Sequence, residues 1–233
     1  MPPVRFADFD ALTFDCYGTL VDWEHGIVAG IRDAVGARGL DASDDELLEA
    51  YARQEAAIEA GGYLRYREVV ARALRGIGAE QGIEVSDAEA AAFGDSVGDW
   101  PPFPDSAEAL AGLKRRFRLG VITNCDDDLF ARSQTRLGVE FDWVVTAQQA
   151  GTYKPSLGNF ELAFKRIDVP RKRILHVAQS LFHDHVPAKR LGMTTVWIDR
   201  RGAAGGGGAT PPASASPDMT FPDMRSFAEA ALA

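Results

Sequence analysis

The alternation of short apolar runs with helix-like stretches in the second half of the chain constrains the fold most strongly. The apolar runs that predict strands cover residues 118–123, 141–147, 173–178, 194–198 and 219–221. The stretches that predict helices lie between and after them, at residues 105–116, 127–137, 156–166, 182–191 and 222–232. Strands that alternate with helices in this way predict an α/β fold with a parallel, doubly wound sheet.

Residues 22–99 follow a different pattern, which is helical throughout. Ile27 and Ile31 lie four positions apart and so share one face of a helix. The segments Ser-Asp-Asp-Glu at 43–46 and Ser-Asp-Ala-Glu at 86–89 have the form of capping boxes, which predict helices that run to about residue 60 and toward residue 97. No strand is expected in this part of the chain, so it cannot join the sheet.

A third helix is expected in this block at residues 63–74, closed by Gly76 and Gly78. The stiff segment Pro-Pro-Phe-Pro at 101–104 marks the return to the alternating pattern. We therefore expect two domains. A core domain comprises residues 1–21 and 101–233, and a helical cap domain, inserted after the first strand, comprises residues 22–100.

The first strand is expected at residues 11–14, and Asp15 follows it directly. Gly18 and Thr19 then turn the chain. In open α/β sheets ligands bind just beyond the carboxyl ends of the strands. A carboxylate at that place can act as a nucleophile or a metal ligand. The alternative is that Asp15 only caps or turns the chain after a strand.

Polar residues also follow the later strands. Thr123 and Asn124 end the strand at 118–123, and their hydroxyl and amide groups can bind substrate oxygens. Lys154 follows the next strand, and a fixed ammonium there would stabilise an ionised Asp15 beside an anionic substrate. Asp184 comes after the strand at 173–178. The alternatives are a turn, a surface lysine and an acid that favours a helix N-terminus.

Four motifs in this order resemble those of the haloacid dehalogenase superfamily. They are Asp15-Cys16-Tyr17-Gly18-Thr19-Leu20, the apolar strand that ends in Thr123, the segment Thr152-Tyr153-Lys154-Pro155, and residues 176–184 with Asp184. The resemblance implies a Rossmannoid three-layer core with a helical cap. It also implies that Asp15 is a nucleophile that forms a covalent ester with substrate.

Two positions distinguish branches of that superfamily. Phosphatase members carry a second Asp two residues after the nucleophile as general acid and base, and here that residue is Tyr17, as in the type II 2-haloacid dehalogenase branch. Phosphatase members also commonly hold Mg²⁺ with two acids of the fourth motif, and here the first of these is Gln179. Because Mg²⁺ prefers several hard oxygen ligands, we expect no metal and no cofactor.

The function implied is hydrolysis of short 2-haloalkanoic acids to 2-hydroxy acids. A leaving halide needs no proton, so Tyr17 suffices where a phosphatase needs an acid. Asp184, with Lys154, is expected to orient or activate the water that attacks the ester on Asp15. The residues expected to bind substrate are Tyr17, Thr19, Thr123, Asn124, Gln179 and a lid arginine, for which Arg53 is the best match and Arg32 and Arg65 are alternatives. Tyr17, Trp23 and Tyr66 are candidates for an apolar pocket lining.

Other features keep two rival functions open. Well-matched dehalogenases carry Ser, Asn and Tyr where this chain has Gln179, Leu181 and Phe160. The rivals are a Mg²⁺-dependent phosphatase and a non-catalytic protein that binds a small carboxylate or a protein partner. His183 and His185 flank Asp184, but residues one or two apart on a helix point to different faces, so a metal site is not expected there.

Composition limits the partners. The chain has 233 residues and a net charge of −9 with no long basic run, which disfavours nucleic-acid binding. No apolar stretch approaches the ~20 residues that span a membrane, and the N-terminus lacks a signal-peptide pattern. Cys16 and Cys125 suggest no disulfide framework. We expect a cytoplasmic protein, with a homodimer implied by resemblance, and a flexible loop at residues 205–217.

Overall fold

The computed structural model describes residues 4–202, 208–210 and 212–233. Its centre is a parallel sheet with strand order β3-β2-β1-β4-β5-β6. The strands are β1 (Ala11–Phe14), β2 (Arg118–Thr123), β3 (Trp143–Thr146), β4 (Ile174–Ala178), β5 (Thr194–Ile198) and β6 (Met219–Phe221). The predicted α/β fold with a parallel sheet is confirmed.

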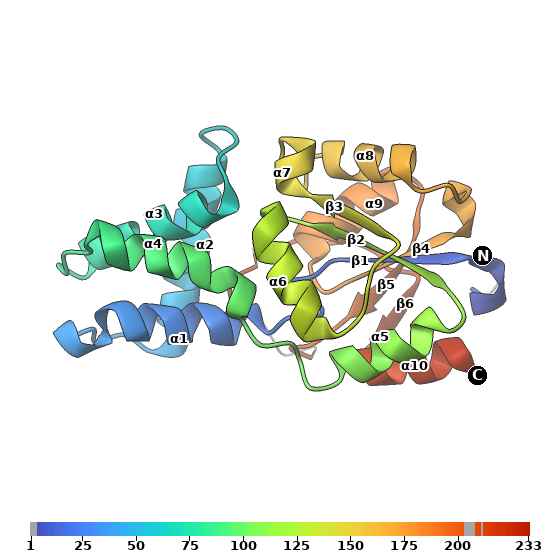
Figure 1. Ribbon diagram of the computed structural model, residues 1–233, viewed down its shortest axis with the longest axis horizontal. Helices are drawn as coiled ribbons and strands as arrows, with labels where there is room; N and C mark the ends of the chain where they lie inside the picture. The colour runs from blue at the N-terminus through green and yellow to red at the C-terminus, as the bar shows by residue number, and fades with distance from the viewer. Residues whose placement is uncertain (1–3, 203–207, 211) are drawn as a thin grey trace.

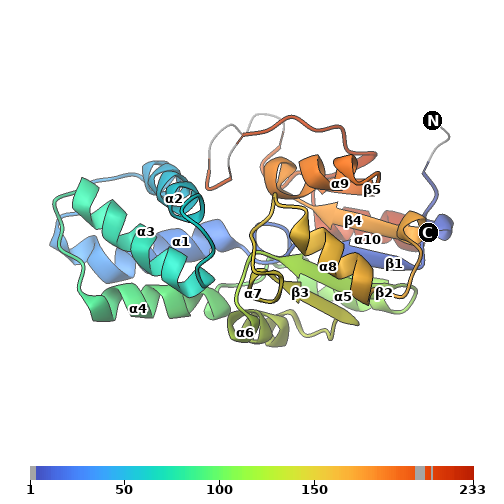
Figure 2. The ribbon, with the colours of Figure 1, turned by 90° about the horizontal axis from the view of Figure 1, so that it is seen from above.

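Helices cover both faces of the sheet and make three layers (Figures 1 and 2). The helices of these layers are α5 (Ser106–Lys114), α6 (Asp127–Leu137), α7 (Ala147–Ala150), α8 (Gly158–Arg166), α9 (Val186–Arg190) and α10 (Met224–Leu232). Leu12 and Phe14 of β1 face a core with Phe130 of α6 and Phe227 of α10, whereas Ala11 faces a second core on the side of α8 and α9. The strand therefore alternates between two buried layers, as a central strand should.

Four further helices lie beside the sheet, next to the carboxyl ends of its strands (Figures 1 and 2). They are α1 (Trp23–Val35), α2 (Asp44–Glu59), α3 (Tyr66–Glu80) and α4 (Asp87–Ser96), called here the four-helix group. The fully buried carboxylate of Asp126, at the start of α6, accepts hydrogen bonds from the backbone N–H of Tyr66 (2.9 Å) and Arg67 (3.2 Å). This bond pair caps α3 and holds the group against the strand ends.

The local signals at the helix starts are confirmed, but the two glycines expected to end the third helix do not end it. Ser43 and Ser86 both form complete capping boxes. Helix α3 continues through Gly76 and Gly78 to Glu80. A Cβ at Gly76 would lie 2.2 Å from the Gln54 side chain, and one at Gly78 would lie 2.7 Å from the backbone of Ile83. These glycines allow close approach of neighbouring segments.

The remaining differences are short. A π-helical turn (Leu181–His185) precedes α9, where one continuous helix was expected, and α7 was not expected at all. Strand β3 is shorter than the apolar run at 141–147. The flexible loop expected at 205–217 falls partly on residues 205–207 and 211, which lie outside the described residues.

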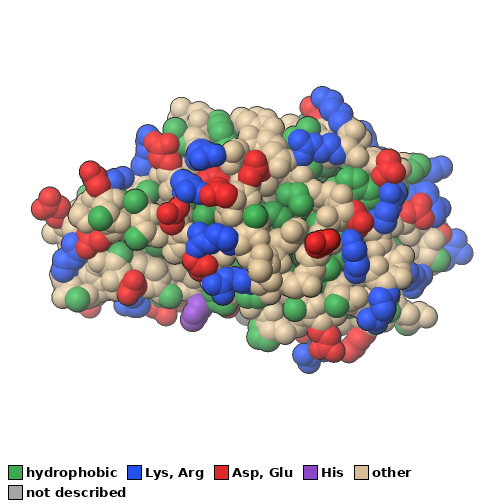
Figure 3. All heavy atoms as spheres, in the orientation of Figure 1, with side chains coloured by type: hydrophobic (Ala, Val, Ile, Leu, Met, Phe, Trp, Pro, Cys, Tyr) green, Lys and Arg blue, Asp and Glu red, His purple; other side chains and the backbone are tan. Residues whose placement is uncertain are grey.

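The surface gives no sign of a large single-charge patch on the side that Figure 3 shows, where acidic and basic side chains are interspersed among the described residues. Cys16 and Cys125 are both free and buried. Within the described ranges, no helix combines the length and the apolar character that crossing a membrane requires.

Helix packing in the four-helix group gives a test. A Cβ at Gly94 of α4 would lie 2.3 Å from the carbonyl oxygen of Arg67 in α3. We expect Gly94→Ala to lower the free energy of unfolding by about 2 kcal/mol, because backbone cannot yield as a side-chain tip can. Gly36→Ala is the matched control, since its Cβ would meet only the Arg32 Cβ at 3.7 Å. Denaturant unfolding measures both, and equal stability of the two variants would contradict this packing.

Candidate active site

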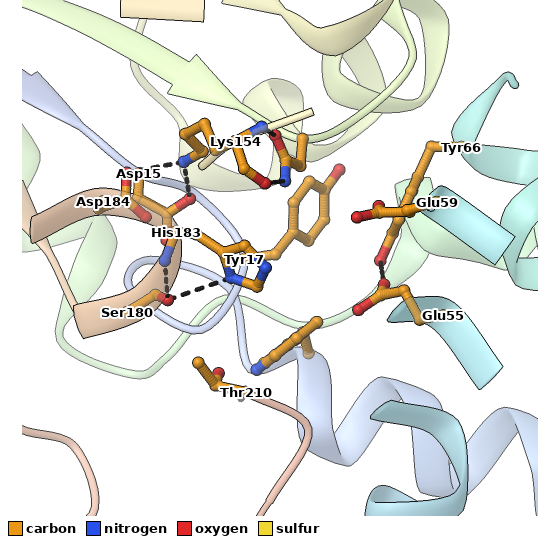
Figure 4. Close-up of a pocket in the computed structure, with 12 residues that line it drawn as sticks. Asp15, Tyr17, Glu55, Glu59, Tyr66, Lys154, Ser180, His183, Asp184 and Thr210 are labelled. Atoms are coloured by element: carbon orange, nitrogen blue, oxygen red, sulfur yellow. Dashed lines mark hydrogen bonds and ion pairs between the residues drawn. The ribbon is translucent and has the colours of Figure 1, made fainter. Parts of the chain in front are cut away.

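Three charged side chains meet where strands β1 and β4 adjoin at their carboxyl ends. Asp15 follows β1, Asp184 lies in the π-helical turn after β4, and Lys154 lies in the loop between α7 and α8. Neighbouring strands whose connections run in opposite directions leave a crevice at this edge of a parallel sheet. The sequence-predicted trio is thus brought together (Figure 4).

Lys154 is the centre of the trio. Its Nζ lies 2.8 Å from Asp15 Oδ1, 2.8 Å from Asp184 Oδ1 and 2.8 Å from the carbonyl oxygen of Ile122 in β2. The side chain is only 1% exposed, so all three ammonium protons are donated inside the protein. The geometry leaves the ammonium no freedom to turn toward solvent.

The surroundings shift the ionisation of both acids. Burial raises the pKa of Asp15 against the opposing effect of the Lys154 charge. At Asp184 burial also disfavours ionisation, but the Lys154 charge and the hydrogen bond from His176 outweigh it and hold the pKa well below its ordinary value. Asp184 is therefore ionised at neutral pH, and its Oδ2 is buried without a hydrogen-bond partner among the described residues.

Neighbouring polar groups hold the trio in place. His176 in β4 bridges Thr13 Oγ1 (3.0 Å from Nδ1) and Asp184 Oδ1 (3.0 Å from Nε2). The Thr19 hydroxyl donates to Asp15 Oδ2 at 2.7 Å and accepts from the backbone N–H of Gln179 at 2.9 Å. The hydrogen bonds from Thr19 and His176 fix the orientation of the Asp15 and Asp184 carboxylates. Sequence reasoning identified Thr19 but missed His176, which lies inside an apolar run.

Asn124 holds the lysine loop. Its side-chain amide donates to the Lys154 carbonyl (3.0 Å) and its Oδ1 accepts from the Lys154 N–H (2.7 Å). Asn124 also lines the pocket with Asp15. Thr123 is fully buried at the end of β2, and its Oγ1 has no hydrogen-bond partner among the described residues.

Tyr17 and Gln179 lie near the trio in different ways. Tyr17 lines the pocket, and its hydroxyl lies 2.9 Å from Ser133 Oγ and 3.2 Å from Cys125 Sγ. Burial raises the pKa of Tyr17 well above its ordinary value, so the phenol stays protonated. Gln179 lines a separate cavity of about 80 Å³ beside Gly18 and Arg200 and is not among the residues that line the Asp15 pocket. Its backbone N–H donates to Thr19, which in turn donates to Asp15.

Arg53 does not reach the pocket, which corrects the sequence-based expectation. It lies on the exposed side of α2, where its guanidinium bonds Glu80 of α3 at 3.2 Å. Neither alternative lines the pocket: Arg32 bonds Asp44, and Arg65 is exposed just before the start of α3. Two residues along a helix correspond to a rotation of about 200°, so the face opposite Arg53 carries Glu55.

The four-helix group instead contributes acids and aromatic rings to the pocket. Glu55 and Glu59 of α2 and Tyr66 of α3 form the wall opposite Asp15 (Figure 4), and Trp23 of α1 also lines the pocket. The lining is completed by Ser180, His183 and Thr210. Trp23 and Tyr66 were anticipated as lining candidates, but the glutamates were missed. Their signal was present, because Glu55 follows Tyr51 by four positions on the buried face of α2.

Three of the four carboxylate oxygens of Asp15 and Asp184 already accept hydrogen bonds, and only Asp184 Oδ2 accepts none from a described residue. Asp15 Oδ1 and Asp184 Oδ1 both accept from the Lys154 ammonium, and Asp15 Oδ2 accepts from Thr19. A hard cation needs several free oxygens in octahedral geometry. Across the described ranges, no group of three or more His, Cys, Asp and Glu side chains is arranged to hold a metal ion.

The fold and site define a parallel α/β protein with a buried acid–lysine–acid cluster at its strand ends. Comparison with known proteins agrees with this class. The family model of haloacid dehalogenase-like hydrolases matches residues 9–181. The haloacetate dehalogenase H-2 of Moraxella sp. (strain B) is 28% identical over 222 residues, which cover 92% of this chain and 94% of that protein.

Solved structures agree on the fold. The L-2-haloacid dehalogenase from Xanthobacter autotrophicus has a TM-score of 0.80 and 19% identity, and the match covers 95% of this chain and 97% of that one. The HAD hydrolase YfnB from Bacillus subtilis, whose structure contains magnesium, has a TM-score of 0.78 and 16% identity, with 97% and 98% covered. The chain belongs to the haloacid dehalogenase-like hydrolase family.

Removal of the buried ammonium tests the cluster. We expect Lys154→Met to lower the free energy of unfolding by about 3–5 kcal/mol, because it leaves two buried carboxylates without a partner. Lys165→Met on the exposed side of α8 is the matched control and should change it by less than about 0.5 kcal/mol. Adding Asp184→Asn to Lys154→Met should recover part of the loss. A Lys154→Met protein as stable as the control in urea would rule out this account.

Proposed function

We propose that the protein hydrolyses the carbon–halogen bond of 2-haloacids through an ester on Asp15, without metal. The observation that carries the proposal is the pairing of a buried, lysine-held Asp15 with a Tyr17 whose phenol stays protonated. A nucleophile is present, and no second acid follows it. The relatives named as haloacetate and 2-haloacid dehalogenases support the same reaction.

The first step forms the ester. A carboxylate oxygen of Asp15 attacks the carbon that bears the halogen, and the halide leaves with the bonding electron pair. The hydrogen bonds from Lys154 and Thr19 orient the carboxylate for this attack. The halide needs no proton, so the absence of an acid at Tyr17 does not hinder the step.

The second step returns Asp15 to its starting form. Water attacks the ester carbonyl, and the Lys154 ammonium stabilises the oxyanion. When the oxyanion collapses, the alkoxide leaves and takes up the proton that the water lost, which gives the 2-hydroxy acid. The second proton of the water goes to solvent, and Asp15 is a carboxylate again. Asp184 is ionised and has a free Oδ2, which makes it the proposed acceptor of the water proton. The four-helix group would act as the cap that closes the site.

Magnesium-dependent hydrolysis of phosphate esters remains the rival reaction. YfnB has the same fold, and its structure contains magnesium. Purified protein should release halide from 2-chloropropanoate and 2-bromoacetate at an unchanged rate in EDTA. Phosphate esters with Mg²⁺ serve as the parallel assay. Phosphate release that requires Mg²⁺, without halide release, would replace our proposal with the phosphatase reaction. If neither halide nor phosphate is released, a non-catalytic binding protein is favoured.

Asp15→Asn tests the nucleophile. We expect it to reduce halide release by about 10³-fold or more while the fold persists. Asp33→Asn, on the exposed side of α1, is the matched control and should retain full activity. In ¹⁸O-labelled water, a single turnover with enzyme in excess should give unlabelled product and labelled Asp15. Label that appears directly in the first product would exclude the ester.

A further inference from the structure

The pocket beside Asp15 has more carboxyl groups than cations to match them. Asp15 and Asp184 share the ammonium of Lys154, and Glu55 and Glu59 lie on the opposite wall (Figure 4). No arginine and no second lysine lines this pocket or the groove next to it among the described residues. Burial lowers the pKa of His183 to about 4, so its ring is neutral near pH 7 and does not correct the imbalance.

Glu55 is held as a hydrogen-bond acceptor that faces the pocket. Its side chain is only 6% exposed, and its Oε1 accepts from the hydroxyls of Tyr51 (3.1 Å) and Tyr66 (2.8 Å). Its second oxygen, Oε2, takes no hydrogen bond from any described residue. A buried carboxyl group with one fixed and one free oxygen is expected to have a partner that comes from outside the chain.

Glu59 follows Glu55 by one helical turn and lies on the same face of α2. Its carboxyl group has no hydrogen-bond or ion-pair partner among the described residues. Burial raises the pKa of Glu59 to about 9, with a contribution from Glu55, and burial raises the pKa of Glu55 to about 7. Burial thus favours the neutral form of both acids, and an ammonium group placed between them would favour their ionised forms.

An aromatic groove leads away from these glutamates. The pocket itself is small, with a volume of about 30 Å³, but the groove that shares Glu55 and Glu59 with it holds about 640 Å³. Tyr63, Tyr153 and Phe182 line the groove, and the rings of the two tyrosines are 5.4 Å apart. Aromatic faces beside carboxylates attract ammonium groups, and the apolar walls suit a methylene chain.

We propose that the substrate carries an ammonium group that Glu55 and Glu59 receive, while its reacting carbon lies at Asp15. The position of the reacting carbon rests on the proposed function, whereas the ammonium site rests on the glutamates and the groove alone. The substrate class is then a 2-haloacid whose methylene chain ends in an amine. Plain short haloacids would be turned over less well.

Binding of unreactive probes tests the ammonium site directly. Calorimetry with the wild-type protein should show that 6-aminohexanoate binds at least about tenfold more tightly than hexanoate, since only the ammonium distinguishes them. Glu59→Gln should reduce this ratio to about twofold or less, because the side chain keeps its size and loses its charge. Glu49→Gln, exposed on the same helix, changes net charge equally and should keep the full ratio.

Halide release then separates this inference from the proposed function. Wild-type protein should prefer 2-bromo-6-aminohexanoate over 2-bromohexanoate in kcat/KM, and Glu59→Gln should remove the preference. If hexanoate binds as tightly as 6-aminohexanoate to the wild type, the ammonium site is wrong whatever the halide assay gives. If the ammonium preference holds in binding but no haloacid is cleaved, the site stands and the proposed reaction fails.

Discussion

The rest of the site depends on the ion pairs that the Lys154 ammonium makes with two buried carboxylates. The ammonium joins Asp15 and Asp184 inside the protein, at 2.8 Å from each. Removing charges from water costs several kcal/mol for each ion, and mutual attraction offsets this only when every donor is used. The Ile122 carbonyl takes the third donor, and Asn124 holds the lysine backbone, so the end of β2 is required for the cluster as much as its members are.

The part of the site that lies at the strand ends could be predicted from the sequence. The carboxyl ends of parallel strands share one edge, so polar residues that follow β1, β2 and β4 must lie close together whatever the details of packing. His176 could not be found in this way. Its bonds to Thr13 and Asp184 depend on the lateral pairing of β1 with β4, and within the chain it is only one polar residue in an apolar run.

The helices of the four-helix group could be predicted from the sequence, but not which face of each helix packs inward or faces the pocket. Capping boxes are local, so Ser43 and Ser86 could be recognised from four residues each. The role of Gly76 depends on Gln54, which is distant in sequence and lies on another helix. Likewise, Arg53 lies within α2 but on the side that faces away from the pocket, because packing sets the rotation of α2 about its own axis.

The two halves of the site therefore have separate physical origins. The strand edge brings Asp15, Lys154 and Asp184 together, and their charges satisfy one another within the core. The face of α2 determines which charge the pocket lacks, and Glu55 and Glu59 leave it short of positive charge. Contacts such as the Asp126 cap on α3 join the two halves without involving the charged side chains of either. A substitution at Glu55 or Glu59 would therefore change the charge of the pocket while the hydrogen bonds among Asp15, Lys154 and Asp184 stay in place.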